Sequence, residues 1–335
     1  MKLWRWLGCM ALPLAGCSGG GSNGNGGGDP VVVTPTPSPG PSSPTPTPSP
    51  GISYPTFASL SGDQSYASSC VGITPLGGER VPVTAGSTLY TRSDGPIRYV
   101  AESQIYTVYA PNNVMQTFGP DDRESSSPSG TIAYTKSGTG GADRFRIIQP
   151  APSTVAMDYT RTTFLDTAGG PTSGTRARTT AYCVIGVPTL TTDIPSAASV
   201  TFTRFAVAGE AYDRRGSSLI TYSLAKSTAT LAVDLTTGQI RATLNLIGTA
   251  NGSDVSLGNF TIDGAIGESD AGISGMGYVG SAPTPGGTIS VNGGFFGPQG
   301  KEFGYTFSQS ISTFPLDGSP SELVFTMVGT VTGAR

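Results

Sequence analysis

The chain has 335 residues with 48 glycines, 27 prolines, 12% charged residues, a net charge of -3 and no histidine. The lack of histidine excludes Ser-His-Asp and Cys-His catalysis and histidine-ligated metal or haem, because histidine is the usual general base and the commonest metal ligand. The near-neutral charge and the absence of basic runs also exclude nucleic acid as the partner, since phosphate binding needs clustered Lys and Arg.

The first residues are typical of an export signal. A positively charged start precedes an apolar run over residues 7–14, which is too short to span a bilayer as a helix. The sequence Leu14-Ala15-Gly16-Cys17 resembles the bacterial lipoprotein signal, in which the chain is cut before the cysteine and the cysteine is acylated. This resemblance implies a signal peptide of residues 1–16 and lipidation of Cys17. Because Ser18 is not the Asp that retains lipoproteins in the inner membrane, it also implies an outer membrane anchor.

Residues 17–53 are predicted to be a disordered tether. Gly, Ser and Asn come first and favour a flexible coil, and Thr-Pro and Ser-Pro repeats follow, which favour extended polyproline II. The tether either holds the folded part clear of the cell surface or serves as a plain spacer.

A β-rich N-terminal domain is predicted for residues 54–194. Its apolar and β-branched runs are short and end at Gly, Pro, Asn or Asp. Cys70 and Cys183 remain after signal cleavage, and in an exported protein two such cysteines most simply form a disulfide. Two buried free thiols are the alternative. The expected strands are 97–101, 105–109, 131–135, 144–148, 157–165 and 178–187.

A barrel of eight antiparallel strands is predicted for residues 195–335, so the fold class is all-β. Apolar residues alternate with polar ones over 230–235 and again over 240–246, on either side of a turn at Thr236-Thr237-Gly238, which predicts a hairpin with one buried face. Eight strands can close on themselves and leave no free edge. The expected strands are 200–207, 226–235, 239–247, 256–263, 272–278, 288–296, 302–310 and 322–332.

The most specific motif is a turn between two aromatic strands near the end of the chain. A Gly-Pro pair follows two phenylalanines, and a second aromatic run begins with a glutamate, which predicts strand, turn and strand. The motif residues are Gly293, Phe295, Gly297, Pro298, Glu302 and Gly304. Their pattern resembles the barrel signature of transferrin-binding protein B and related bacterial surface lipoproteins, although Tyr305 stands where members usually have glycine. The resemblance implies a handle-like domain before the barrel, and non-enzymatic capture of host iron proteins, haem carriers or complement regulators.

The candidate functional residues are few. The carboxylates of the barrel region do not show the paired spacing of a glycosidase, so we expect no enzyme, no cofactor and no metal. Glu302 is expected to accept hydrogen bonds from turn N–H groups or a barrel side chain. Alternate members of the set Phe295, Phe296, Tyr305 and Phe307 are expected to fill the barrel while the others face out, and a barrel that holds one small ligand is the alternative. Arg214 and Arg215 form a loop that either contacts an anionic ligand or is a solvated turn.

The sequence therefore predicts a lipid-anchored outer membrane protein that binds an unknown solute or protein. A structural or protein-interaction module of the cell envelope with no small-molecule ligand is the alternative.

Overall fold

The computed structural model describes most of the chain from residue 51 onward. The signal peptide, Cys17 and nearly all of the tether lie outside the described residues. The described ranges are 51–73, 88–90, 95–110, 114–138, 141–167, 178–216, 218–267, 277–285, 287–313 and 322–335. They contain β-strands and short 3-10 turns, and among them no helix is long and apolar enough to cross a membrane. The 3-10 turns are η1 (Phe57–Ser59), η2 (Pro120–Asp122), η3 (Pro152–Thr154) and η4 (Pro298–Gly300).

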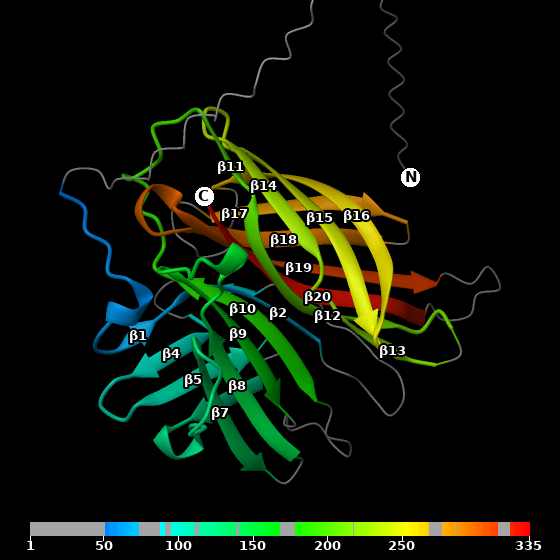
Figure 1. The fold of residues 1–335 in the computed structure, drawn as a ribbon, viewed down its shortest axis with the longest axis horizontal. Coiled ribbons are helices and arrows are strands. Elements are labelled where there is room, and N and C mark those ends of the chain that lie inside the picture. The colour runs from blue at the N-terminus through cyan, green and yellow to red at the C-terminus, as the bar shows by residue number, and fades with distance from the viewer. Residues whose placement is uncertain are drawn as a thin grey trace, which may run out of the picture. The chain divides into compact units, whose positions relative to one another are not determined.

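Two antiparallel sheets make up the N-terminal region (Figure 1). The four-stranded sheet has the order β1 (Gln64–Ser65), β4 (Ile97–Val100), β5 (Ile105–Ala110) and β6 (Val114–Phe118). The six-stranded sheet has the order β3 (Thr88–Tyr90), β2 (Ala67–Ile73), β10 (Thr179–Gly186), β9 (Thr160–Thr167), β8 (Gly141–Ile148) and β7 (Thr131–Gly138). All six strands that the sequence predicted here are present. Strands β1, β2, β3 and β6 were not predicted.

The core of the N-terminal region is aromatic. Phe118 and Phe145 are fully buried and stack with their ring centroids 5.4 Å apart, and Tyr106 and Tyr134 pack around them. Aromatic pairs of this kind add to the free energy gained from burial alone.

The predicted disulfide is confirmed. Cys70 on β2 lies directly opposite Cys183 on β10, and the two form a cross-strand disulfide at the edge of the aromatic core.

The C-terminal sheet closes into a ring of eight strands. Its order is β11, β14, β15, β13, β12, β20, β19, β18, β17 and β16, and β16 also pairs with β15. The closed circuit therefore runs from β15 through β13, β12, β20, β19, β18, β17 and β16 back to β15. Strand β14 pairs with β15 beside β13, and β11 pairs with β14. Figure 1 shows this ring in yellow-green to red. The strand bounds are β11 (Ser199–Phe202), β12 (Arg204–Asp213), β13 (Ile220–Ser223), β14 (Thr228–Asp234), β15 (Gln239–Ala250), β16 (Ser253–Ile266), β17 (Gly277–Thr284), β18 (Gly287–Phe296), β19 (Glu302–Thr313) and β20 (Glu322–Ala334).

The inside of the barrel is filled by side chains. Burial alternates residue by residue along β14 and the first half of β15, as the sequence predicted. Large aromatic side chains occupy the interior, which confirms the prediction that they form a core: Tyr278, Phe295, Phe303, Tyr305 and Phe307. A small barrel has just enough room for such side chains.

Two predicted strand bounds in the barrel were wrong. The fifth strand was placed at 272–278, but β17 begins at Gly277 and continues through Pro283, and residues 271–276 lie outside the described residues. Proline is tolerated near a strand end, where its missing N–H is not needed. The first strand is split into β11 and β12 by Thr203 alone. The second corresponds to β14, and the separate short strand β13 before it was not predicted.

Candidate functional site

The motif predicted from the sequence forms the corner between β18 and β19. Turn η4 joins the two strands, so the predicted hairpin is confirmed. Gly297 has φ of +72°, a conformation that favours glycine, and an added Cβ would collide with the ring of Tyr159. An added Cβ at Gly304 would collide with Val184. Both glycines therefore allow the N-terminal region to approach the barrel closely.

Glu302 holds the two regions together through its carboxylate. Its Oε1 accepts the backbone N–H of Asp158 at 2.6 Å and its Oε2 accepts that of Tyr159 at 3.0 Å. The side chain is only 1% exposed, and burial raises the pKa of the carboxyl although these hydrogen bonds oppose the rise. Hydrogen bonds from turn N–H groups were expected, but the donors belong to the segment before β9 and not to the corner itself.

The chain between β10 and β11 also binds this corner. Val187 and Thr189 exchange backbone hydrogen bonds with both sides of Phe296: the N–H of Gly297 reaches the Val187 carbonyl at 2.9 Å, and the N–H of Thr189 reaches that of Phe295 at 2.9 Å. The motif residues thus form a joint between the barrel and the N-terminal region. We call this set of contacts the joint.

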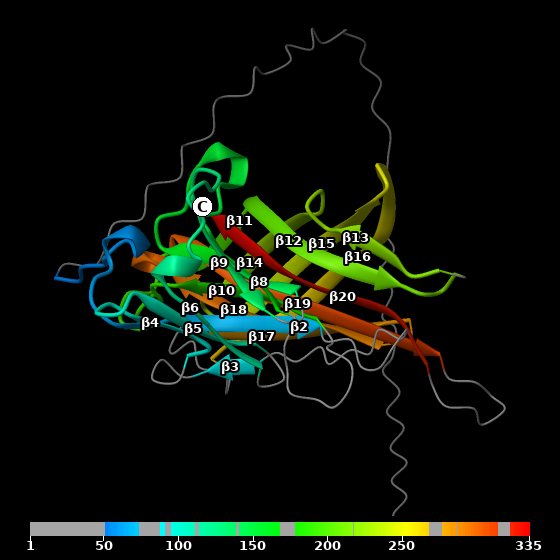
Figure 2. The same cartoon turned by 90° about the horizontal axis from the view of Figure 1, so that it is seen from below.

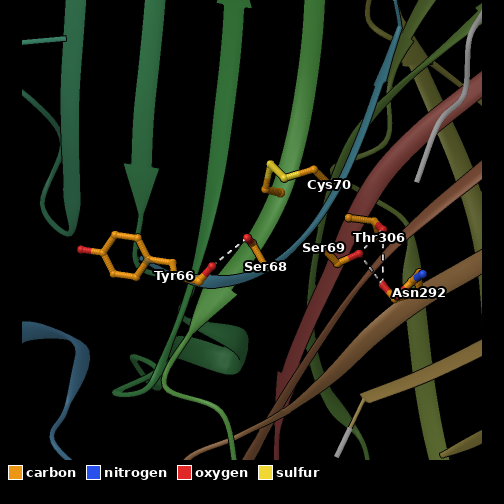
Figure 3. Close-up of a disulfide and its surroundings, with 7 residues drawn as sticks. Tyr66, Ser68, Ser69, Cys70, Asn292 and Thr306 are labelled. Carbon is orange, nitrogen blue, oxygen red and sulfur yellow. Dashed lines mark hydrogen bonds between the residues drawn. A yellow bond between two sulfur atoms is a disulfide. The ribbon is translucent and has the colours of Figure 1, made fainter. Parts of the chain in front are cut away.

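A second contact between the two regions lies on β2. Ser69 Oγ donates a hydrogen bond to the carbonyl of Asn292 at 2.9 Å and lies 2.7 Å from Thr306 Oγ1. Figure 3 shows Ser69 pointing toward these barrel residues while the neighbouring Cys70 points the other way, into the N-terminal sheet. Figure 2 shows β2, in blue, beside β18 and β19, which it contacts.

A groove of about 470 Å³ lies next to this contact, on the outer face of strands β16 to β19. We call it the outer groove. Its lining combines glycines and apolar residues, among them Val71 of β2, with five small polar residues: Ser281, Ser290, Asn292, Thr306 and Ser308. None of these residues was predicted to form a site. For four of them the signal was the polar half of the alternation in the predicted strands 288–296 and 302–310, and Ser281 lay outside every predicted strand.

The groove carries little net charge. Among its described lining residues the charged one is Asp263, whose Oδ1 accepts a hydrogen bond from Arg241 Nε at 2.7 Å. This contact lowers the pKa of Asp263, so the carboxylate stays ionised beside the guanidinium.

The loop after β12 holds the two predicted ligand-contact residues. Arg215 makes a fork with its neighbour Asp213, with Nε 3.0 Å from Oδ1 and a terminal nitrogen 2.7 Å from Oδ2, and its guanidinium lies 4.9 Å from the ring centroid of Phe325. Arg214 donates its backbone N–H to Val324 at 2.7 Å and is half-buried. The two arginines therefore do not present a shared binding site for an anion. A ligand would have to compete with Asp213 for the guanidinium of Arg215.

The remaining carboxylates of the barrel region do not form a common site among the described residues. Asp234 accepts the N–H groups of Thr236 and Thr237 in the β14–β15 turn, and those hydrogen bonds lower its pKa. Glu268 and Asp270 lie outside the described residues. Within the described ranges, no three His, Cys, Asp or Glu side chains gather closely enough to hold a metal ion.

No protein-family model and no curated protein matches the sequence. Solved structures do. The chain resembles transferrin-binding protein B. It is 16% identical to a double mutant of that protein from Haemophilus parasuis, with a TM-score of 0.40, covering 81% of this chain and 44% of the other. It is also 16% identical to transferrin-binding protein B of serogroup B Neisseria meningitidis, with a TM-score of 0.40, covering 80% of this chain and 44% of the other. The chain thus spans less than half of the length of these proteins.

Proposed function

We propose that this protein is a lipid-anchored outer membrane protein that binds a ligand without converting it chemically. The observation that carries the proposal is the outer groove. Its volume of about 470 Å³ is within the range of roughly 300 to 1,000 Å³ that is typical of ligand sites. The contact of Ser69 with Asn292 and Thr306 supports a binding role because it holds β2 against the barrel, so that one wall of the groove is in place before a ligand arrives.

The anchor in this proposal is Cys17. Its support is the sequence Leu14-Ala15-Gly16-Cys17 with Ser18 after it, and the tether over residues 17–53 gives the folded part reach from the membrane. A role in iron or haem acquisition is the first process to test, because the motif resembles that of surface lipoproteins with such roles. Haem would need a ligand other than histidine, which the chain lacks.

Protease treatment of intact cells tests the location. We expect the folded part to be digested on whole cells, and Cys17→Ser to release the protein from the membrane fraction. Protection on intact cells, together with membrane attachment of the Cys17→Ser variant, would contradict the proposal.

Thermal unfolding in the presence of metabolite and host-protein panels tests the binding role. A ligand that binds only the folded state raises the melting temperature in proportion to the logarithm of its concentration over its Kd. A ligand for the outer groove should raise the melting temperature. An unchanged melting temperature with every metabolite and every host protein would contradict the binding role.

A protein-interaction module is the second candidate, and the loop after β12 favours it. Leu219 in this loop and Ile220 at the start of β13 are 43% and 39% exposed, and Arg215 lies in the same loop as Leu219. Exposed apolar side chains beside an arginine are common in protein interfaces. A protein partner that is lost on Arg215→Glu and retained on Ser290→Leu would favour this candidate over a solute in the groove.

A further inference from the structure

Three serines form a straight row across the floor of the outer groove. Ser281 on β17 lies opposite Ser290 on β18, and Ser290 lies opposite Ser308 on β19. Neighbouring strands are about 4.8 Å apart, so the row presents hydroxyl groups at a regular spacing of that size. Asp263 on β16 continues the row beyond Ser281.

The short side chains of this row are the reason for the hollow. Ser281 and Ser290 are exposed and Ser308 is half-buried, whereas Asn292 and Thr306 in the next row are 7% and 2% exposed beneath β2. The groove is therefore open along the serine row and closed on one side by β2, with Val71 at that wall.

The lining does not suit a charged ligand. Phosphate and carboxylate groups are bound in proteins by arginine and lysine, and neither residue is among the described lining residues. The single carboxylate, Asp263, is already neutralised by Arg241 at 2.7 Å. A cation would thus have to displace the guanidinium.

A hydroxyl group is both a donor and an acceptor, so the row can match ligand hydroxyls in either sense. Val71 and Val279 add apolar surface beside it. Repeating hydroxyl groups, apolar C–H faces and no charge are the properties of a neutral sugar chain.

We propose that the outer groove binds a neutral oligosaccharide, laid across β17, β18 and β19 with its hydroxyl groups on Ser281, Ser290 and Ser308. This inference rests on the proposed binding function and names the chemical class of its ligand.

Titration calorimetry of the full-length protein in detergent, with cello-, malto- and chito-oligosaccharides as probes, tests the proposal. We expect at least one neutral series to bind. Ser290→Leu should weaken that binding by about tenfold or more, because it removes a central hydroxyl and fills the groove. Ser256→Leu is the matched control, since Ser256 is an exposed serine on β16 outside the groove, and it should leave the affinity unchanged.

Insoluble polysaccharides of the same linkage, assayed by pull-down, distinguish a long glycan surface from a short soluble chain as the source of the ligand.

The outcomes separate the two proposals. Binding of uronic-acid or sulfated sugars without their neutral counterparts, or full affinity in Ser290→Leu, would overturn the oligosaccharide proposal and leave the binding function standing. Failure of all sugars while another solute raises the melting temperature would do the same. Absence of any solute and any protein partner would overturn both.

Discussion

The carboxylate of Glu302 accepts the backbone N–H of Asp158 at 2.6 Å, across 144 positions of sequence. Replacing one of the two acceptor oxygens should therefore weaken the joint. In Glu302→Gln one carboxylate oxygen becomes an NH₂ group that faces a backbone N–H, and one buried donor loses its acceptor. We expect unfolding to cost about 1 to 3 kcal/mol less than in the wild type. Denaturant unfolding measures the change. Glu102→Gln, at an exposed site, is the control and should have no effect.

The pH dependence of stability should carry the signature of Glu302. Burial raises its folded-state pKa above the ordinary value of 4.5, so the folded protein binds the proton more tightly than the unfolded chain. Such a group stabilises the folded state most at low pH, and this contribution is lost as the pH rises from about 4.5 through the raised pKa. The stability difference between the wild type and Glu302→Gln should thus shrink with rising pH. A difference that stays constant would contradict the raised pKa.

The disulfide should be a major source of stability. It closes a loop with a sequence separation of 113, for which the chain-entropy treatment gives about 4 to 5 kcal/mol. The double variant Cys70→Ala/Cys183→Ala should lose a stabilisation of this size. Both cysteines are buried, so a reducing agent should act on the wild type only as it unfolds. Rapid reduction under native conditions would show that the strand pair opens locally.

The conformation and the close contact at Gly297 can be separated by comparison with Gly252. Both have φ above +70°, but Gly252 has open space where a Cβ would lie, and Gly297 has the ring of Tyr159. Gly252→Ala should cost about 1 kcal/mol from backbone strain alone. Gly297→Ala should cost clearly more, because Tyr159 must move. Equal melting temperatures for the two variants would mean that the joint is not tightly packed.

The barrel could be predicted from the sequence because its strands have one buried face. Leu231 and Val233 alternate with exposed neighbours, and such a period of two is a direct consequence of strand geometry. Strand β2 could not be predicted, because all seven of its residues are buried and it shows no alternation. Its Ser69 faces the barrel, where a single sequence gives no indication of a partner.

The candidate site was predictable only in part. The motif at the corner was recognised, and a structural role for Glu302 was expected. Its hydrogen-bond donors were not, since Asp158 is distant in sequence and only the packing of the N-terminal region brings it near. The row of Ser281, Ser290 and Ser308 depends on the register of three strands, which alternation alone leaves undetermined.

Strand β2 contributes adjacent residues to two different hydrophobic clusters. Cys70 packs with the aromatic core of the N-terminal sheets, and Val71 packs with Tyr182 and with Val328 of the barrel. Neither half can lose this strand without exposing apolar surface of the other. Calorimetry should accordingly record a single cooperative heat-absorption peak for both halves, and a partner that grips one half would also protect the other from thermal denaturation.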